Sequence, residues 1–391
     1  MIIERKSIPK DWDLISVEDC FDILDNQRKP LNESERNLMR GNIPYYGANG
    51  VVDYVNEFLF DDDLILIAED GGYFDEFQTR PIAYKVKGKA WINNHAHVLK
   101  AKNGYYQDYL FYCLEHKNIL IWLNGGTRAK LNKGDLEKLP IQIATHPEQK
   151  AIAQVLSTAD AAIHTTEKII AQKVLRKKWL MQQLLTGKKR LNGFENTKWK
   201  IQPLENFIKP IVREVPKPST PYLGIGLRSH GKGTFLKHDE QPEKNSMDNF
   251  YVVRPNDLIV NITFAWEQAI AIVRPEDDGA LASHRFPTYT FIEDKGHPDF
   301  FRFYILQPRM KFMLQMISPG GAGRNRVMSK SDFIKLEFLL PDYKEQTAIA
   351  QVLQAADKEI GLLKAKAEKL REQKKGLMQV LLTGKVRLKI N

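Results

Sequence analysis

The chain of 391 residues contains only two cysteines, Cys20 and Cys113, which lie far apart and outside any Cys-x-x-Cys spacing. This scarcity excludes a disulfide framework and a cysteine-based zinc site, and it favours a reducing compartment such as the cytoplasm. No apolar run approaches the roughly 18 residues that a membrane-spanning helix needs. The N-terminus becomes charged at Glu4, Arg5 and Lys6, before an apolar signal region could form. We therefore expect a protein that is neither secreted nor embedded in a membrane.

Several enzyme motifs are also missing. The sequence has no Pro-Pro pair, so it lacks the Asp/Asn-Pro-Pro-Tyr/Phe element by which amino-methyltransferases resemble one another. The closest approach to a phosphate-binding loop, Gly226–Lys232, is followed by Gly233 where a magnesium-holding Ser or Thr is required. His95 and His97 lack a helical His-Glu-x-x-His spacing, so we expect them to form local hydrogen bonds. We predict no catalytic residue and no metal ligand.

What the chain does have is length, aromatic residues and positive charge. At roughly 150 residues per domain it is long enough for two or three domains, and its 43% hydrophobic content is sufficient for real cores. Lys and Arg number 58 against 48 Asp and Glu, which indicates a polyanionic partner such as nucleic acid. The surplus lies in two segments: residues 148–191 hold nine basic and three acidic residues, and residues 345–388 hold nine and five.

These two segments are copies of one another. They align without a gap and are identical at 23 of 44 positions, opening on Glu-Gln-x-Ala-Ile-Ala-Gln-Val-Leu and closing on Leu-Leu-Thr-Gly-Lys-x-Arg-Leu. Thr145 and Asp342 stand where an N-cap is expected, and Gly187 and Gly384 where a left-handed C-cap is expected. Each copy is therefore predicted to be one long helix, and the pair indicates a duplication.

Apolar positions in both copies advance by alternating steps of four and three residues, which is the pattern of a heptad seam weakened by lysines. A single such stripe is typical of a helix buried in its own domain, but two copies in one register favour helices that pair with each other. Chain order then requires an antiparallel pair, roughly 50 Å long at about 1.5 Å per residue, with pseudo-twofold symmetry. The predicted helix-helix seam comprises Ile152, Leu156, Ile163, Ile170, Leu180, Leu184, Ile349, Leu353, Ile360, Leu363, Leu370, Leu377 and Leu381.

The segments before each helix have mixed α/β character and read as two versions of one domain. Trp12 of the first segment corresponds to Trp199 of the second, and the turn at 44–47 corresponds to the turn at 221–224. Each segment ends in a glycine-rich basic loop followed by a short helix and a strand. The predicted fold class is α/β (or α+β) recognition domains in two copies, joined by two long helices. The predicted divisions are a first domain at 1–146, a first helix at 147–191, a second domain at 192–342, and a second helix with its tail at 343–391.

This alternation resembles the DNA-specificity subunit of Type I restriction-modification systems, and the resemblance covers the whole chain. The resemblance rests on the repeated sequences at the starts and ends of the two helices, together with Ile43–Asn49 and Gly226–Phe235. The resemblance implies a non-catalytic subunit whose two target-recognition domains each read one half of an asymmetric, interrupted site in double-stranded DNA. It further implies two methyltransferase subunits docked on the helices and a restriction/translocase subunit in the larger complex. No cofactor is then expected on this chain, since S-adenosylmethionine, ATP and Mg²⁺ belong to those partners.

Donor side chains in turns and basic loops are the candidate DNA contacts, because Arg, Lys, Asn and Gln match base edges and phosphates. The alternative for the tyrosines is the core, and for the lysines a solvated surface. A rival for the whole chain is a coiled-coil adaptor that binds only proteins and has no direct DNA affinity. The candidate DNA-binding residues are Tyr45, Tyr46, Asn49, Arg128, Lys130 and Lys133 in the first domain, and Arg228, His230, Lys232, Arg324 and Arg326 in the second.

Overall fold

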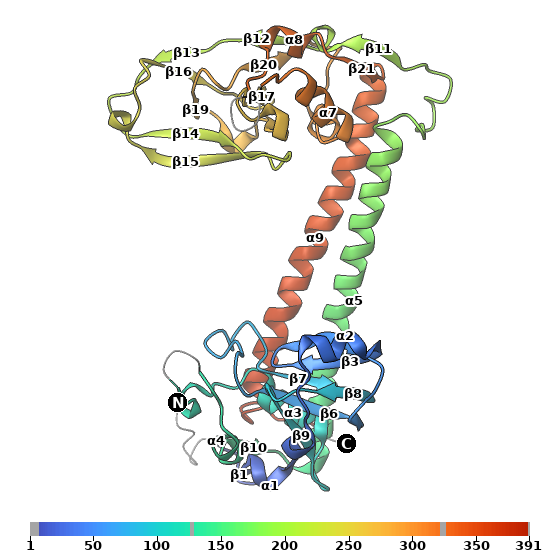
Figure 1. Ribbon diagram of the computed structural model, residues 1–391, viewed down its shortest axis with the longest axis vertical. Coiled ribbons are helices and arrows are strands. Elements are labelled where there is room, and N and C mark those ends of the chain that lie inside the picture. The colour runs from blue at the N-terminus through green and yellow to red at the C-terminus, as the bar shows by residue number, and fades with distance from the viewer. Residues whose placement is uncertain (1–7, 126–128, 321–325, 390–391) are drawn as a thin grey trace. The chain divides into compact units, whose positions relative to one another are not determined.

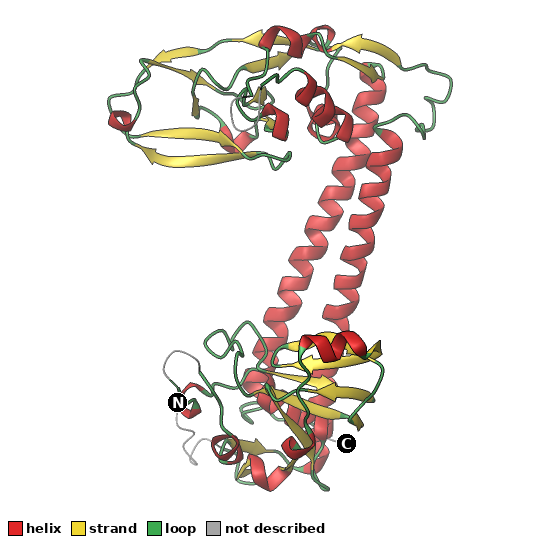
Figure 2. Cartoon of the chain, viewed as in Figure 1, coloured by secondary structure: helices red, strands yellow, loops and turns green. Residues whose placement is uncertain are grey.

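A computed structural model describes residues 8–125, 129–320 and 326–389, and the chain groups into two compact units. Unit 1 comprises residues 1–167 and 365–391, and unit 2 comprises residues 168–364 (Figure 1). Each unit thus contains half of each long helix, which differs from the predicted scheme of separate domains and helices. Both units mix helices with strands (Figure 2). Within the described ranges, no helix is both long and apolar enough to cross a membrane.

The two repeated segments form the helices α5 (His146–Leu184) and α9 (Tyr343–Leu381), each of 39 residues. At the start of α9 the Asp342 carboxylate accepts a hydrogen bond from the Glu345 backbone N–H at 3.0 Å, as an N-cap does. Both helices end three residues before the predicted glycines, and the turn that follows each helix closes on Gly187 or Gly384, with φ of 70° and 68°. This left-handed conformation is easily adopted by glycine, so the predicted helix ends are confirmed.

Within each unit the halves of α5 and α9 run antiparallel, as predicted. Residues later in α5 form ion pairs with residues earlier in α9. Every predicted seam residue is buried or partly buried, as a helix-helix seam requires. Lysines do occupy seam positions, and Lys374 is only 7% exposed. The ion pairs between the helices are Asp160–Lys374 and Glu167–Arg371 in unit 1, and Lys173–Glu359 and Lys177–Asp357 in unit 2.

Unit 1 contains two four-stranded sheets and one two-stranded pair, with strand orders β2-β9-β6-β7, β4-β3-β8-β5 and β1-β10. The central strand β6 is buried along its whole length, which agrees with its continuous apolar run. The strands are β1 (Asp13–Ser16), β2 (Phe21–Ile23), β3 (Arg40–Gly47), β4 (Gly50–Val55), β5 (Phe60–Asp61), β6 (Leu64–Ala68), β7 (Ala83–Val86), β8 (Lys89–Ile92), β9 (Ala96–Ala101) and β10 (Pro140–Ile143). The short helices are α1 (Val17–Cys20), α2 (Glu33–Leu38), α3 (Gln107–Glu115) and α4 (Lys133–Glu137).

Unit 2 repeats this frame with its own sheets, ordered β12-β20-β17-β18, β13-β16-β19-β14-β15 and β11-β21. The strands are β11 (Lys200–Pro203), β12 (Ile208–Ile211), β13 (Glu214–Pro216), β14 (Tyr222–Leu227), β15 (Thr234–Glu240), β16 (Asn249–Val252), β17 (Leu258–Val260), β18 (Ile270–Ile272), β19 (Leu281–Ala282), β20 (Thr288–Phe291) and β21 (Glu337–Leu340). The short helices are α6 (Pro298–Tyr304), α7 (Pro308–Met316) and α8 (Lys330–Ile334).

In each unit the helix ends share one hydrophobic core with the strands. Ile152 and Leu156 of α5 join Leu381 of α9 in the core of unit 1, while Leu184 of α5 and Leu353 of α9 lie in the core of unit 2. The helices are therefore integral to both units, because their apolar ends bury the same surface as the sheets do.

A three-residue anchor recurs at the start of each long helix. In unit 1 the buried Glu148 carboxylate accepts a hydrogen bond from Trp12 Nε1 at 2.9 Å and another from Arg387 Nε at 2.5 Å. In unit 2 Glu345 accepts from Trp199 Nε1 at 3.0 Å and from Arg190 Nε at 2.7 Å. The duplication therefore extends to long-range contacts, each joining a helix start to the tail of the other helix.

Candidate nucleic-acid interface

In unit 1, three connections meet just beyond the C-terminal end of β6. Asn49, in the turn between β3 and β4, donates from Nδ2 to the carbonyl of Gly71 at 2.8 Å. The backbone N–H of Leu131 donates to the carbonyl of Glu69 at 2.8 Å, and Lys130 forms an isolated β-bridge with Asp70. Two predicted contact residues, Asn49 and Lys130, are thus both attached to the loop that follows β6.

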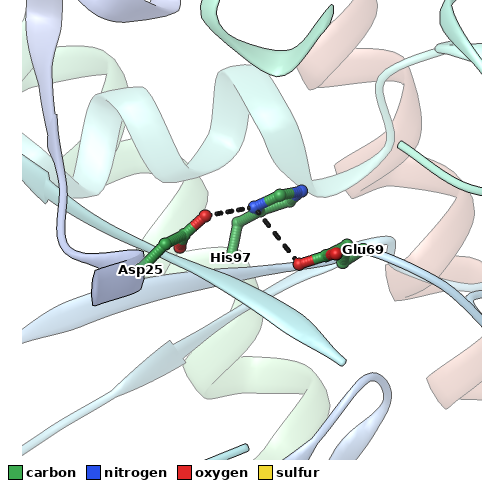
Figure 3. Close-up of side chains that lie close together, drawn as sticks. All are labelled: Asp25, Glu69 and His97. Carbon is green, nitrogen blue, oxygen red and sulfur yellow. Dashed lines mark hydrogen bonds and ion pairs between the residues drawn. The ribbon is translucent and has the colours of Figure 1, made fainter. Parts of the chain in front are cut away.

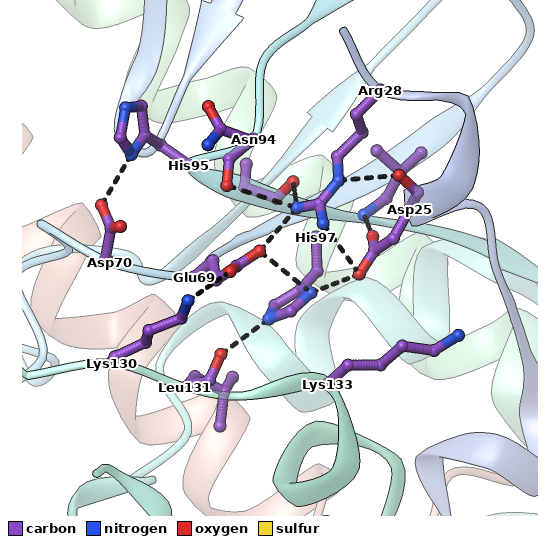
Figure 4. Close-up of polar contacts among 12 residues, drawn as sticks. Asp25, Arg28, Glu69, Asp70, Asn94, His95, His97, Lys130, Leu131 and Lys133 are labelled. Carbon is purple, nitrogen blue, oxygen red and sulfur yellow. Dashed lines mark hydrogen bonds and ion pairs between the residues drawn. The ribbon is translucent and has the colours of Figure 1, made fainter. Parts of the chain in front are cut away.

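Charged side chains pack beneath this meeting point (Figure 4). Glu69 accepts from Arg28 at 2.7 Å and lies 3.0 Å from Lys130 Nζ. His97, which is 1% exposed, lies with Nδ1 2.6 Å from Asp25 Oδ2. His95 is outside this cluster and bonds to Asp70 at 2.7 Å. Local hydrogen bonding by both histidines, as predicted, is confirmed.

The side chains of Asp25, Glu69 and His97 converge closely enough to raise the question of a metal site (Figure 3). Each of the three is already bonded, since Asp25 accepts from the backbone N–H of Val98 at 2.9 Å in addition to facing His97. His97 Nε2 lies 2.8 Å from the carbonyl of Leu131. Arg28 adds a cation directly against both carboxylates. A metal ion at this position faces two neutralised carboxylates and an imidazole whose nitrogens are both engaged, so the donor set fits an ion cluster better than a metal.

The two tyrosines of the first predicted motif lie deeper than a DNA contact requires. Tyr45 is 2% exposed, and its hydroxyl accepts from the backbone N–H of Leu31 at 3.0 Å. Tyr46 is half-buried and stacks on Tyr84 with ring centroids 5.9 Å apart, and its burial raises the pKa of its hydroxyl. Tyr45 is therefore a core residue and leaves the set of candidate DNA contacts, because a pleated strand alternates its faces and this residue points inward.

Of the remaining predicted residues of unit 1, one lies at the surface and one lies outside the described residues. Lys133 is exposed at the start of α4, with its ammonium 3.7 Å from Glu137. Arg128, like Arg324 of the second domain, lies outside the residues that the structure describes. Lys130 and Lys133 thus remain the described basic candidates at this end of unit 1.

In unit 2 the glycine-rich turn between β14 and β15 presents three exposed residues, Arg228, His230 and Lys232. Its backbone is held against the connection between β17 and β18, since His230 N–H donates to the Glu267 carbonyl at 2.6 Å and Gly231 N–H to Gln268 at 2.9 Å. His230 itself has a φ of 63°, a left-handed conformation within this tight turn.

Arg326, from the far end of the same unit's sequence, reaches the same connection. Its guanidinium lies over the ring of Trp266 at 5.3 Å from the centroid. Nearby, Arg285 donates to the hydroxyl of Thr263 at 3.2 Å. Sequence reasoning missed Trp266, Thr263 and Arg285 because they lie in unrepeated loops without a motif. The contact of Arg326 with Trp266 joins residues 60 positions apart, so no local pattern in the sequence signals it.

The two units therefore assemble their candidate residues in the same way. In each, a turn from a neighbouring sheet and the segment after the glycine-rich loop both attach to the connection that follows the central strand, β6 or β17. This arrangement presents guanidinium, ammonium and amide donors on loops supported by a rigid sheet, and such donors can bond to base edges and phosphates.

Comparison with known proteins agrees with this geometry. The family model for the Type I restriction modification DNA specificity domain matches residues 9–173 and 214–372. A putative Type I restriction enzyme specificity subunit of Haemophilus influenzae is 37% identical over 145 residues, a match spanning 37% of this chain and 36% of that relative. The MjaVIII specificity subunit of Methanocaldococcus jannaschii is 23% identical, with 98% and 94% of the two chains covered. The putative MjaX specificity subunit of the same organism is 28% identical over 72% and 68%.

Solved structures show the same fold. The S subunit of a Type I restriction-modification system from M. genitalium aligns with a TM-score of 0.58 at 13% identity, covering 97% of each chain. The duplicated α/β units and their paired helices define a chain of the DNA-specificity class. The family match covers most of the sequence in two separate stretches, and the chain belongs to the Type I restriction-modification DNA-specificity family.

Proposed function

We propose that this chain directs a Type I modification complex to an asymmetric, interrupted DNA site, with each unit reading one half. The observation that carries the proposal is the repeated placement of basic and amide side chains around the connection after β6 and after β17. Two similar frames with different loops suit two different half-sites. The membership of the chain in the specificity family supports the same reading.

In this proposal the chain carries no catalysis of its own. Two methyltransferase subunits dock on the helical repeats and bind S-adenosylmethionine, while a restriction/translocase subunit uses ATP and Mg²⁺. The surplus positive charge of the helical repeats lies outside the loops that read bases. The isolated chain is therefore expected to bind DNA weakly, and tight binding is expected only when the methyltransferases close around the duplex.

The central experiment is single-molecule sequencing of methylated adenines in host DNA with the gene intact and deleted. The expected result is a two-part motif with a fixed gap that is methylated only when the gene is present. Methylation that is unchanged by the deletion overturns the proposal. Binding of the complex to that duplex is expected to weaken steeply as salt rises, because phosphate contacts release counterions. An adaptor that binds only proteins has no duplex affinity at any salt concentration.

The spacer role of the helices has its own test. Matched insertions of one heptad into α5 and α9 add about 10 Å to the paired helices at about 1.5 Å per residue. The gap between the methylated half-sites is expected to lengthen by about three base pairs at about 3.4 Å per pair. An unchanged gap in an active complex contradicts the spacer role while leaving DNA reading intact.

A further inference from the structure

His97 sits between the ion cluster of unit 1 and the segment that carries Lys130. Its Nδ1 lies 2.6 Å from Asp25 Oδ2, and its Nε2 lies 2.8 Å from the carbonyl of Leu131 (Figure 4). A backbone carbonyl can only accept hydrogen bonds, so Nε2 carries a hydrogen and donates it to Leu131. His97 therefore joins the cluster through Nδ1 and the backbone beside Lys130 through Nε2.

The carboxylates of the cluster are held in their ionised form. Burial opposes the ionisation of Asp25, but hydrogen bonds from His97 and from the Val98 backbone outweigh it and keep the pKa of Asp25 below its ordinary value. Burial likewise opposes ionisation of Glu69, and bonds from Arg28 and Lys130 keep its pKa low. The cluster is thus a set of matched charges, and such a set fixes the geometry of its members.

The cluster holds the Lys130 segment at three points. His97 bonds to the Leu131 carbonyl, Glu69 accepts from the Leu131 backbone N–H at 2.8 Å, and the Glu69 carboxylate lies 3.0 Å from Lys130 Nζ. The backbone of Lys130 also exchanges two 2.8 Å hydrogen bonds with Asn124. The Lys130 side chain remains 45% exposed. Its backbone is thus fixed by the cluster, and its side chain pairs with Glu69 while staying partly open to solvent.

Unit 2 makes the matching backbone contact without this cluster. After its own glycine-rich loop, Met328 N–H donates to the Ile262 carbonyl at 2.9 Å, just as Leu131 donates to Glu69. Met328 is 2% exposed and lies in the hydrophobic core of the unit. The residue that accepts this bond is an isoleucine in place of Glu69, so Met328 is held here by apolar packing and a backbone bond, and the next residue, Ser329, donates to the Ile317 carbonyl at 3.1 Å.

We propose that His97 is a positioning residue for DNA reading by unit 1. Its Nε2–H bond to Leu131 holds Lys130 where it meets the first half-site, whereas unit 2 positions its counterpart segment through Met328. The inference rests on the proposed function, because it assigns His97 a part in reading only one of two half-sites. His97 acts through Leu131 and does not itself touch DNA.

Two substitutions separate positioning from stability. His97→Gln places an amide donor near the Nε2 position and keeps the bond to Leu131, but it removes the hydrogen bond to Asp25 Oδ2. His97→Asn places its donor near the Nδ1 position, so it keeps the bond to Asp25 and loses the bond to Leu131. A stability role predicts that Gln is the more damaging change, because it removes one hydrogen bond from a buried carboxylate, whereas Asn removes one from a backbone carbonyl. A positioning role predicts that Asn is the more damaging for DNA reading.

The measurement is binding of the full complex with methyltransferase to three duplexes: the native site, the site with its first half scrambled, and the site with its second half scrambled. In the Asn variant, discrimination against the scrambled first half is expected to fall about 10-fold, comparable to losing one good base contact. In the Gln variant it is expected to stay near the wild-type value. Discrimination at the second half is the internal control, and it is expected to be unchanged in both variants.

The other outcomes are decisive as well. Equal loss in both variants, loss in the Gln variant alone, or parallel loss at both half-sites overturns the positioning role of His97. Urea unfolding of both variants establishes that the proteins compared are folded. A wild-type complex that does not distinguish the native duplex from either scrambled one shows instead that the proposed function itself has failed.

Discussion

Units 1 and 2 share their frame, but they differ in how charge is buried within it. Lys374 in unit 1 and Lys177 in unit 2 occupy the same seam position, and each lies 5.2 Å from the centre of an aromatic ring, Tyr112 or Phe303. Three residues after that ring, unit 1 has Glu115 and unit 2 has Leu306. Duplication therefore preserved the lysine and the ring, while unit 1 alone buried a second carboxylate against them.

This difference places Lys374 in a closed network. Its ammonium lies 2.8 Å from Glu115 and 2.7 Å from Asp160, whose other oxygen accepts from Tyr112 at 2.7 Å. Within the described ranges the ion-pair partner of Lys177 is Asp357, a side chain that is 47% exposed. The comparison teaches that one repeat position supports either a buried ionic network or a more exposed ion pair, depending on the residue that stands three positions after the aromatic ring.

The largest expected effect follows from breaking that network. Lys374→Met leaves Glu115 buried without a partner, and the loss is expected to be about 3 kcal/mol of unfolding free energy. Lys177→Met is expected to lose less than about 1 kcal/mol, because its pair is largely solvated. Urea unfolding of the full chain measures both. The double change of Lys374→Met with Glu115→Leu, which copies unit 2, is expected to recover most of the loss; no recovery contradicts this account.

The next effect concerns the anchor that both units retain. Trp12→Phe removes one hydrogen bond to the buried Glu148, and Trp199→Phe removes one to the buried Glu345. A hydrogen bond to a charged acceptor is worth about 2 kcal/mol, so each variant is expected to lose a similar amount. Calorimetry of the two variants checks the equality. A loss in only one of them shows that the anchors are alike in geometry but not in energy.

A smaller and asymmetric effect is expected at the glycines that end the long helices. A methyl group on Gly384 would lie 2.3 Å from Pro9 Cγ, whereas one on Gly187 would lie 3.3 Å from the ring of Trp199. Both positions have positive φ, so each alanine costs about 1 kcal/mol from backbone strain alone. Gly384→Ala is therefore expected to lower the melting temperature more than Gly187→Ala. The reverse order contradicts the close approach of Pro9.

At neutral pH the smallest expected difference in stability between the two units comes from their buried carboxylates. This difference is expected to grow as the pH falls. Burial opposes the ionisation of Glu148, but bonds from Arg387, Trp12 and Thr145 lower its pKa; Asp25 and Glu69 are lowered as well. When folding lowers a carboxyl pKa below its ordinary value of 3.8 for Asp or 4.5 for Glu, the ionised group stabilises the folded state at any pH above that ordinary value. This stabilisation is lost as the pH falls through the lowered pKa.

Unit 2 has a comparable carboxylate in Asp277, whose pKa is lowered by Arg274 and Thr234 against the effect of burial. Among the described residues, unit 1 has more such carboxylates than unit 2. The hydrogen-exchange protection of unit 1 is therefore expected to be lost before that of unit 2 as the pH falls below about 4. Hydrogen-exchange protection factors for β6 and β17 across this range measure the order. Earlier loss in β17 contradicts the contrast.

Much of the helical frame was predictable because its signals are local or repeated. The step of four and three residues predicted the seam, including the seam position of Lys374, and the glycines at 187 and 384 marked the helix ends. The echo of Trp12 in Trp199 predicted two similar domains. Antiparallel pairing followed from chain order, since a helix that returns to its starting region must run backward.

The candidate site was predictable only in outline. Asn49, Lys130 and the turn at 228–232 do lie on the loops that the sequence singled out. Tyr45 was misplaced, because a tyrosine in a strand fits either face and only the packing of its neighbours decides which. The role of His97 was also hidden, since its partners Asp25 and Leu131 lie 72 and 34 residues away along the chain.

By itself, then, the sequence determined the duplication, the length and ends of the long helices, the residues of their seam and the α/β character of the two domains. These properties depend on periodicity and on backbone preferences that act over a few residues. Only the tertiary structure decided which charges are buried together: Lys374 with Glu115, Glu148 with Arg387, and His97 with Asp25. A buried charge needs a partner at hydrogen-bonding distance, and the chain selects that partner through folding rather than through spacing in the sequence.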